Sequence, residues 1–538
     1  MTEQTSVARR YLDYFGALGV PVIFGLPGVH NLAFWRDVDP DCPPLVGVRH
    51  EQTTVYAADG LARATGGLGV ALTTTGPGAA NAVAAFGEAA ACGSPVVLVA
   101  SEISTQLARP GQLRGVLHES RDQAGMFEPL AKAVFRPRSA AQAVAALREA
   151  VDTALAWPRG PVYIDIPTDV LSLPAMAPLP PDEPERQIPC DGAVRSLADL
   201  VNAVGSVVLW CGSGVIQSGA ETAVREMAER LGAPVVTSYG ARGLLPSNHP
   251  LAVSLPPHEP EVAQLIASAD LMLAIGTDFD AMMTRNWRMP MPGKLAVINC
   301  NPEDLSKNFN PDLAVMGDAR ETLARLIPLL EEKKASRNDA AERGWRRLEL
   351  ESLSAPSVEF VRRVAAAAGS DTVVVCDMAV AGYWYGGYAQ VDKPRRLQYP
   401  VGWGTLGYAL PASVGPAAAG MHTLAICGDG GVMFALSELA TIAQERLPVT
   451  LLIVDDGAYG MLAYDQEVAG DPEHGVQLMS PDWEKLGQAF RVPTTVLSEC
   501  DAILEKNIRA AVESGGPHMI VLAADLFPPR TTSPRWFE

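Results

Sequence analysis

Two aspartates that each follow an apolar run are the residues of this sequence best suited to hold a metal ion. Residues 424–427, Leu-Ala-Ile-Cys, indicate a buried strand, and the Gly-Asp-Gly-Gly turn after it contains Asp429. Residues 449–454 indicate a second buried strand, followed by two acids of which the second is Asp456. The segment between them has apolar residues at helical spacing and predicts one helix. Strand, helix and parallel strand bring the two strand ends side by side, so this edge is expected to bind Mg²⁺ and a phosphate group.

The elements that must position these acids belong to a regular alternation of strands and helices. Strands are expected at 22–24, 45–48, 69–74 and 95–100, again at 207–210, 234–236, 271–275 and 296–299, and finally at 372–376 and in the two runs above. This alternation predicts an α/β fold of three doubly wound parallel sheets. The expected division is an N-terminal domain at 1–177, a central domain at 190–329, a charged helical linker at 330–354 and a C-terminal domain at 355–538. A proline-rich stretch at 178–184 separates the first two.

Composition narrows the class of protein. The chain has 538 residues, of which 48% are hydrophobic and 19% charged, enough to bury large cores. Its 42 Lys and Arg against 61 Asp and Glu give a net charge of −19, which argues against nucleic acid or an anionic membrane as a partner. The 8 cysteines are scattered and form no CxxC pair, as expected of reduced thiols. The first residues lack the apolar core of a signal peptide, so a cytoplasmic protein is expected.

A second group of polar residues follows the strands of the first third. Glu51 comes just after the strand expected at 45–48, and a Gly- and Thr-rich turn from Thr75 to Asn81 follows the strand at 69–74. Parallel strands present their carboxyl ends at one sheet edge, where ligands bind. Glu51 taken alone is equally explained as a charge at a helix N-terminus.

Several motifs, in the same order along nearly the whole chain, resemble one family. They are FGLPG at 24–28, RHEQ at 49–52, TTTGPGAAN at 73–81, GWGTLGYALP at 402–411 and GDGG at 428–431. This order is similar to that of thiamine diphosphate-dependent enzymes of the acetolactate synthase, pyruvate oxidase and 2-oxo acid decarboxylase family. One departure is Asp455-Asp456, where the family usually has Asn-Asn, and aspartate coordinates Mg²⁺ at least as well.

The resemblance implies a role for each matching residue. Asp429, Asp456 and the backbone carbonyl of Ala458 would hold Mg²⁺ against the diphosphate. Glu51 would hydrogen-bond N1′ of the aminopyrimidine, a task that suits a shielded carboxyl of raised pKa. The Gly404 carbonyl would accept the 4′-amino group, and Leu406 would be the apolar wedge that bends the cofactor. The remaining cofactor contacts implied by the resemblance are Thr75, Asn81, Gly428, Gly430, Gly431, Tyr459, Gly460 and Met461.

Two histidines distinguish the expected reaction. His30 and His118 lie in loops that the family directs at the cofactor, and a decarboxylase needs a proton donor near neutral pH. The turn Gly28-Val29-His30 together with LHExxDQ at 117–123 most closely resembles the 5-guanidino-2-oxopentanoate decarboxylase type. Purely structural roles for both histidines remain open.

The central domain resembles the one that carries FAD in acetolactate synthases, but FAD is not expected here. Gly212-Ser213-Gly214 is an incomplete dinucleotide fingerprint. The synthases place arginines after the next strand end, whereas this chain has Asp278 and Asp280. The domain is therefore expected to be a structural spacer.

The sequence thus predicts a thiamine diphosphate- and Mg²⁺-dependent, non-oxidative decarboxylase of a 2-oxo acid, acting through a C2 ylide and an enamine. An acetolactate synthase-like carboligase is the alternative, and a catalytically silent homologue with a regulatory or scaffold role is a second one. Asp465 and Glu467 suit a polar or cationic substrate tail, although solvated surface charges explain them as well. By resemblance, the chain forms a dimer or tetramer with active sites between chains.

Overall fold

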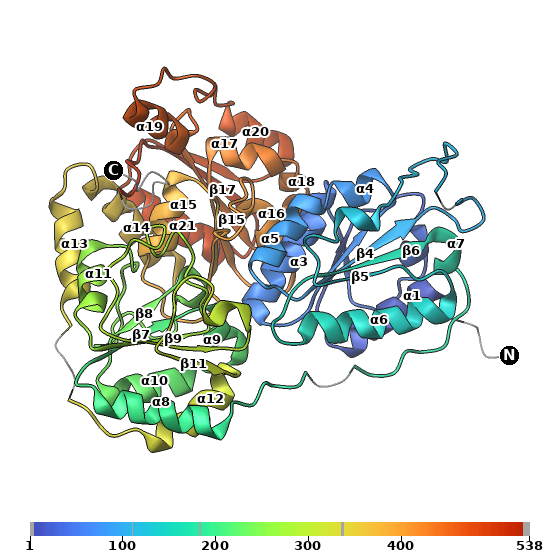
Figure 1. Ribbon diagram of the computed structural model, residues 1–538. Coiled ribbons are helices and arrows are strands. Elements are labelled where there is room, and N and C mark those ends of the chain that lie inside the picture. Colours follow the sequence, from blue (N-terminus) through green and yellow to red (C-terminus); the bar gives the residue numbers. More distant parts are fainter. Residues whose placement is uncertain (1–4, 110, 182–183, 335–337, 531–538) are drawn as a thin grey trace.

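The strands of this protein form three separate sheets, in which every pair of neighbouring strands runs parallel. The computed structural model describes residues 5–109, 111–181, 184–334 and 338–530. Figure 1 shows one unit around each sheet, the N-terminal unit in blue, the central unit mainly in green and the C-terminal unit in orange and red. The predicted α/β fold of three doubly wound sheets is confirmed.

The N-terminal sheet has six strands in the order β2-β1-β3-β4-β6-β5. Helices pack on both of its faces. Its strands are β1 (Ile23–Gly25), β2 (Leu45–Gly47), β3 (Gly69–Thr73), β4 (Val96–Glu102), β5 (Ala133–Phe135) and β6 (Val162–Pro167); its helices are α1 (Val7–Ala17), α2 (Leu32–Arg36), α3 (Glu51–Thr65), α4 (Pro77–Ala80), α5 (Val83–Ala91), α6 (Ala140–Leu155) and α7 (Thr168–Leu171).

The central sheet has five strands in the order β11-β10-β9-β7-β8. A helix then leads from this unit to the third sheet. The strands are β7 (Val207–Cys211), β8 (Val235–Thr237), β9 (Leu271–Ile275), β10 (Leu295–Asn299) and β11 (Leu313–Met316); the helices are α8 (Asp191–Ala203), α9 (Ser213–Ser218), α10 (Glu221–Leu231), α11 (Pro260–Ala267), α12 (Ala319–Leu326) and the connecting α13 (Ala340–Leu350).

The C-terminal sheet has six strands in the order β13-β12-β14-β15-β17-β16. Asp429 directly follows the inner strand β14, and Asp456 directly follows the neighbouring inner strand β15. The strands are β12 (Val373–Cys376), β13 (Leu397–Gln398), β14 (Thr423–Gly428), β15 (Val449–Asp455), β16 (Thr494–Leu497) and β17 (His518–Ala523); the helices are α14 (Ala355–Ala368), α15 (Val380–Tyr388), α16 (Ala409–Ala418), α17 (Asp429–Val432), α18 (Glu438–Gln444), α19 (Gly460–Ala469), α20 (Trp483–Phe490) and α21 (Ala502–Ser514).

The prediction of a single helix between β14 and β15 is wrong, because this segment consists of two short helices separated by a turn. Helix α17 passes into a 3₁₀ turn, η5 (Met433–Ala435), before α18 begins. The carbonyl oxygen of Phe434 accepts a hydrogen bond from Nε2 of Gln52 at 2.8 Å, so it bonds outside its own segment. Met433 and Phe434, both in this turn, are 42% and 54% exposed.

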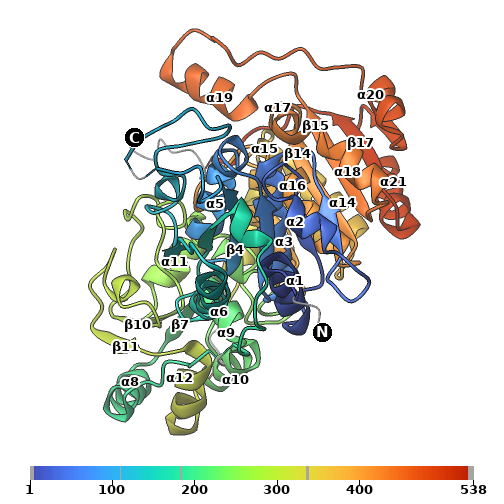
Figure 2. The same ribbon diagram turned by 90° about the vertical axis from the view of Figure 1, so that its right-hand side faces the viewer.

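The N-terminal and C-terminal units pack tightly within one chain through α3 and α16, which lie side by side (Figures 1 and 2). The backbones meet at two glycines: a Cβ on Gly60 would lie 2.2 Å from the carbonyl oxygen of Ala412, and one on Gly415 would lie 2.0 Å from that of Ala57. Side chains of both units form one hydrophobic core around this contact. The orientation of α3, which starts at Glu51, is therefore set by the C-terminal unit of the same chain.

In the part of the chain that the structure describes, no helix combines the length and apolar character needed to cross a bilayer.

Candidate active site

Glu51 occupies the first position of α3, at the carboxyl edge of the N-terminal sheet. Asn81, which ends α4, donates from Nδ2 to Glu51 Oε2 at 3.0 Å. A carboxylate at a helix N-terminus is favoured by the helix dipole. The structure thus brings these two predicted residues together, with Asn81 exposed and Glu51 partly exposed.

Thr75 lies in the same turn, but its side chain faces the protein. It is fully buried, and its hydroxyl lies 3.0 Å from the hydroxyl of Ser101 in β4. No atom of Thr75 is exposed in this chain, so the structure does not bring this predicted cofactor contact to the surface of the site. The next backbone amide, Gly76 N, donates to Oε1 of Gln123, which is 1% exposed. Gln123 was not among the predicted site residues, and its position five residues after His118 was the only signal for it.

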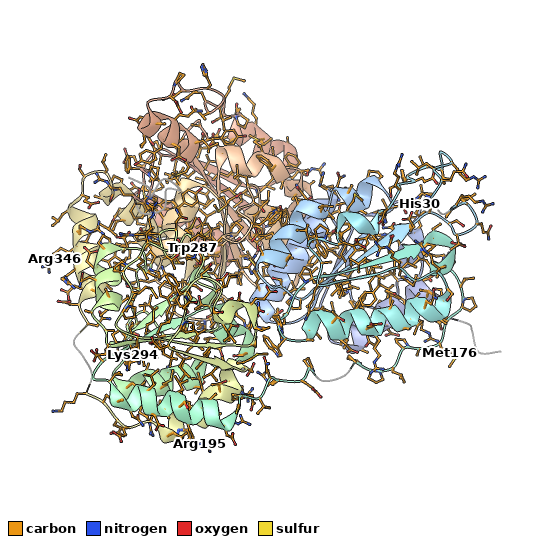
Figure 3. The ribbon with its side chains drawn as sticks, viewed as in Figure 1. His30, Met176, Arg195, Trp287, Lys294 and Arg346 are labelled. Carbon is orange, nitrogen blue, oxygen red and sulfur yellow. The ribbon has the colours of Figure 1, made fainter. Side chains whose placement is uncertain are left out.

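His30 and His118, which are 88 residues apart, lie together at this edge. Their Nδ1 atoms are 3.3 Å apart, and their rings meet edge to face with centroids 5.2 Å apart. Burial and the neighbouring His118 lower the pKa of His30, which favours its neutral form, and a neutral Nδ1 can accept a hydrogen bond from His118 Nδ1–H. Figure 3 places His30 at the outer end of the N-terminal unit.

Backbone geometry holds His118 against the glycine turn. The φ of His118 is 67°, a left-handed conformation that is uncommon for a residue other than glycine. A Cβ on Gly76 would lie 2.6 Å from the carbonyl oxygen of His118, so only glycine permits this approach. The adjacent Glu119 accepts the amides of Arg114, Gly115 and Val116 and so stabilises the loop.

Asp429 and Asp456 meet at the carboxyl edge of the C-terminal sheet, as predicted from their strands. Gly428 and Val454, at the ends of β14 and β15, are paired across the ladder. Asp429 is 3% exposed, and neither of its carboxylate oxygens accepts a well-formed hydrogen bond from the described residues. Burial and the nearby Asp456 and Asp455 raise the pKa of Asp429 to about 7. Burial also raises the pKa of Asp456.

The two consecutive acids after β15 have different partners. Asp455 accepts from Ser480 Oγ and from Trp483 Nε1, both at 2.6 Å, and so holds the start of α20. Asp456 accepts a local bond from Ala458 N at 3.1 Å and faces the Gly460 end of α19. Asp455 therefore has a structural role, whereas Asp456 is available to bind a ligand at the site.

A cavity of about 110 Å³ lies beside these acids, and all the residues that line it belong to the C-terminal unit. Every C-terminal residue predicted to contact the cofactor lines it, except Gly404. Apolar side chains and Tyr383 complete the wall. The predicted residues in the lining are Leu406, Gly428, Asp429, Gly430, Gly431, Asp456, Ala458, Tyr459, Gly460 and Met461.

The oxygen ligands predicted for this site suit a hard divalent cation. No group of three or more His, Cys, Asp or Glu side chains suited to a metal occurs among the described residues. The predicted set needs only two carboxylates and the carbonyl of Ala458, and magnesium keeps several of its ligands from water and phosphate. A buried carboxylate without donors, such as that of Asp429, is costly, and a cation held between it and Asp456 would remove that cost.

Asp377, which was not predicted, organises the segment that carries Gly404 and Leu406. It follows β12, the third strand end at this edge, and is fully buried. Gly407 N donates to both of its oxygens, at 2.9 and 3.0 Å. Burial raises the pKa of Asp377 to about 6. An acid directly after a buried strand was the available signal, the same one that identified Asp429.

Helix α19 forms one side of the site. Burial, then the charges of Asp377 and Asp465, raise the pKa of Tyr383 to about 12, which places Asp465 near this cavity-lining tyrosine. Glu467 is exposed on the same helix.

The central unit has a larger cavity, of about 850 Å³, where its strand ends meet the other two units. Several of its polar groups bond to neighbouring protein groups. Lys307 Nζ lies 3.4 Å from Asp278 and 2.8 Å from Asp304, and Arg395 donates to the carbonyl of Ile216.

Three domain families match the chain in sequence order. They are the N-terminal TPP binding domain of thiamine pyrophosphate enzymes at residues 5–126, their central domain at 194–326 and their C-terminal TPP binding domain at 377–522.

Curated relatives cover nearly the whole chain. A probable 2-ketoarginine decarboxylase, AruI, of Pseudomonas aeruginosa is 33% identical over 97% of this chain and 94% of its own length. A probable acetolactate synthase large subunit of Methanocaldococcus jannaschii is 30% identical over 96% of this chain and 92% of its own length. An acetolactate synthase of Mycobacterium bovis is 32% identical over 91% of this chain and 83% of its own length.

One solved structure has the same fold. It is an X-ray structure, from Mycobacterium smegmatis, of a protein described as a thiamin diphosphate-dependent enzyme, with a TM-score of 0.83, 24% identity and coverage of 97% of this chain and 99% of that one. With the relatives above, these matches confirm the resemblance seen in the motifs. This chain belongs to the thiamine pyrophosphate enzyme family and is a thiamine diphosphate-dependent enzyme of its decarboxylase and acetolactate synthase branch.

Proposed function

We propose that this enzyme catalyses the non-oxidative decarboxylation of a 2-oxo acid. The observation that carries this assignment over carboligation is the His30–His118 pair, because release of an aldehyde requires a proton donor at the carbon that lost its carboxyl group. The match to a probable 2-ketoarginine decarboxylase supports the same assignment.

Asp429, Asp456 and the Ala458 carbonyl would hold Mg²⁺, with the amides of Gly430 and Gly431 toward the diphosphate. Thiamine diphosphate, when bound, supplies the carbanion and the electron sink that no side chain provides. Glu51 would hold a proton at N1′ of the pyrimidine. His118, whose Nδ1 faces the neutral His30, would deliver the proton that completes the aldehyde.

The complete site would lie between two chains. The cavity at Asp429 contains no N-terminal residue, and Glu51 is partly exposed within its own chain. Apolar side chains next to the site are also exposed, among them Phe434 at 54% and Leu462 at 52%. These observations support a dimer or a tetramer in which Glu51 of one chain faces Asp429 of the next.

Glu51→Gln tests this arrangement. The variant should keep its affinity for thiamine diphosphate and lose about 100-fold or more in kcat, because glutamine cannot hold the proton. Unchanged turnover would refute the role of Glu51. Mixing Glu51→Gln with Asp429→Asn and re-associating the chains should restore about a quarter of wild-type activity, since half of the dimers would have one intact site. No recovery in confirmed mixed dimers would argue against a shared site.

The substrate tail is proposed to be cationic. Asp465 lies close to Tyr383 at the cavity, Glu467 is nearby on α19, and AruI is named for a guanidinium-bearing 2-oxo acid. Release of CO₂ from a panel of 2-oxo acids with cationic, neutral and acidic tails would test this. Preference for a neutral or acidic tail would overturn it.

A second candidate is an acetolactate synthase-like carboligase, which the acetolactate synthase relatives favour. Acetolactate or acetoin formed from pyruvate would support it over the decarboxylase. Failure of the protein to bind thiamine diphosphate with Mg²⁺ in calorimetry would instead favour a catalytically silent scaffold.

We also propose that the central unit holds no FAD, because Asp278 and Asp304 with Lys307 occupy the strand ends where a dinucleotide needs cations. A flavin band near about 450 nm in the purified protein would contradict this.

A further inference from the structure

Leu406 reaches the candidate cofactor cavity from a segment with no regular structure of its own. Residues 402–408, here called the wedge segment, contain no helix or strand. Gly404 and Gly407 in it have φ values of 75° and 79°, which other residues rarely adopt. Because no hydrogen-bond ladder holds this segment, the position of Leu406 depends on what its neighbours contact.

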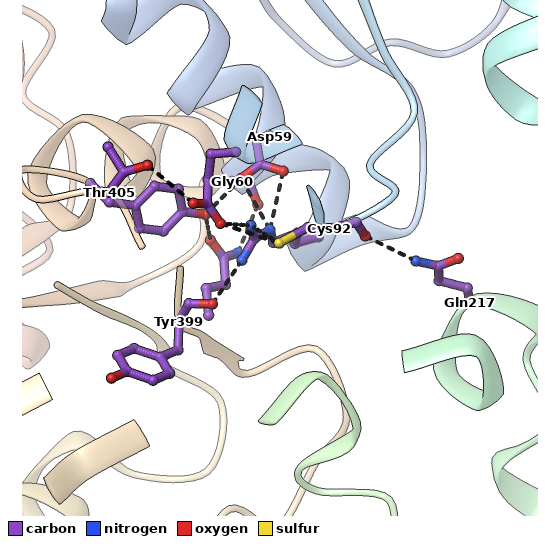
Figure 4. Close-up of polar contacts among 10 residues, drawn as sticks. Asp59, Gly60, Cys92, Gln217, Tyr399 and Thr405 are labelled. Carbon is purple, nitrogen blue, oxygen red and sulfur yellow. Dashed lines mark hydrogen bonds and ion pairs between the residues drawn. The ribbon is translucent and has the colours of Figure 1, made fainter. Parts of the chain in front are cut away.

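Of the two neighbours of Leu406, Gly407 is held by Asp377 of its own unit, whereas Thr405 contacts the N-terminal unit of the same chain. Thr405 Oγ1 donates to Glu88 Oε2 at 3.2 Å (Figure 4). The ring of Trp403 lies over Gly87, where a Cβ would be 2.8 Å from Trp403 Cε2. The wedge segment is therefore attached to α5 through the residues beside Leu406.

A second anchor follows directly. Tyr408 donates its hydroxyl to Asp59 Oδ2 at 2.8 Å, and Asp59 lies on α3. Arg63, one turn further along α3, lies 3.0 Å from both Asp59 and Glu88 and joins the two acids. Figure 4 shows these contacts converging at the junction of the units, where Gln217 of the central unit also donates to the Cys92 carbonyl at 3.4 Å.

Burial of this charged cluster at the interface between the units costs free energy. Asp59 and Glu88 are fully buried, and the side chain of Arg63 is only 16% exposed. Buried ions of this kind lose their hydration, and apolar residues of similar size often stabilise a fold as well or better. What such a network does provide is a single geometry, because each member is satisfied in only one arrangement. Glu88 accepts from Arg63, Cys92 and Thr405.

We propose that Glu88, held by Arg63, is a positioning residue that sets the place of Leu406 through Thr405. The inference rests on the proposed function, in which Leu406 bends the cofactor. It assigns part of the geometry of the cofactor site to a buried ion cluster on α3 and α5, which does not line that site's cavity.

Thr405→Val is the test, because it removes the hydroxyl and keeps the shape and the charges. Proton exchange at C2 of bound thiamine diphosphate in D₂O is the readout, since it needs the bent cofactor but no substrate. We expect exchange and kcat to fall about 10-fold, with cofactor affinity and melting temperature nearly unchanged. Thr405→Ser should restore both rates. Thr372→Val is the matched control, because Thr372 is 4% exposed and its hydroxyl donates to the Ala368 carbonyl at 2.5 Å, away from the wedge segment.

The outcomes separate the two proposals. If the wild-type enzyme shows no C2 exchange, the proposed function fails. If it exchanges and Thr405→Val exchanges equally fast, the positioning role of Glu88 is refuted. A lower melting temperature with normal exchange would also refute it, because the contact would then be only structural.

Discussion

The C-terminal and central units are built on the same plan and differ in how their strand-end acids are satisfied. In both, a parallel sheet presents acids at its carboxyl edge beside a cavity. Asp278 of the central unit pairs with Lys307 at 3.4 Å. The two oxygens of Asp429 in the C-terminal unit accept no well-formed hydrogen bond from the described residues.

This difference indicates where a ligand belongs. A polar group that the protein itself satisfies contributes to the fold, whereas a buried carboxylate left without donors implies a cation from outside. The same distinction separates Asp455, held by Ser480 and Trp483, from its neighbour Asp456.

The largest expected effect is that of Asp429→Asn on cofactor binding. Removal of a metal-ligating charge should weaken Mg²⁺-dependent binding of thiamine diphosphate by more than about 100-fold, measured by calorimetry. Without Mg²⁺ the same variant should melt at a higher temperature than the wild type, because a buried, uncompensated charge is gone.

The matched control is Asp278→Asn in the central unit, which should change that affinity less than about two-fold. Equal losses in the two variants would mean that the contrast between the two sheet edges has no functional meaning.

A smaller effect is expected for the histidine pair. His118→Gln should lower kcat by about 100-fold, with little change in cofactor affinity, because the loss falls on proton delivery. His249→Gln makes the same change in the central unit, where His249 pairs with Glu229 at 3.2 Å, and should leave kcat unaltered. Steady-state CO₂ release would measure both, and a fully active His118→Gln enzyme would remove the basis for the decarboxylase assignment.

The smallest expected effect concerns stability in the central unit. Burial raises the pKa of Asp280 to about 6, so the folded state binds this proton more tightly than the unfolded chain. Its contribution to stability is therefore most favourable below about pH 4 and declines as pH rises through about 6. Asp280→Asn should remove this decline and gain about 2 kcal/mol above pH 6, seen in urea midpoints across pH.

For comparison, Asp371→Asn should change stability in the opposite direction, because Lys393 lowers the pKa of Asp371. That variant should lose a little stability above about pH 4. A pH profile unaffected by Asp280→Asn would show that burial does not raise the pKa of this carboxyl.

Much of the molecule was predictable from local patterns. Apolar runs ending at glycine and acid residues identified most strands and the pairing of Asp429 with Asp456, since parallel strand ends must share an edge. The loops with His30 and His118 were identified by motif, and their residues lie in contact. By contrast, the broken helix after Asp429 was missed, and one of its carbonyl groups, that of Phe434, bonds to Gln52 of another unit, a contact that no local pattern shows.

The sequence by itself determined the three-sheet fold, the family and the meeting of Asp429 with Asp456 at one sheet edge, because these depend on short-range periodicity and on residue types at strand ends. Only the tertiary structure decided that Asp455 is structural, that Asp377 and Glu88 hold the segment around Leu406, and that Thr75 turns its side chain inward. These roles depend on which distant backbone and side-chain donors reach each group, and no local pattern in the chain encodes that.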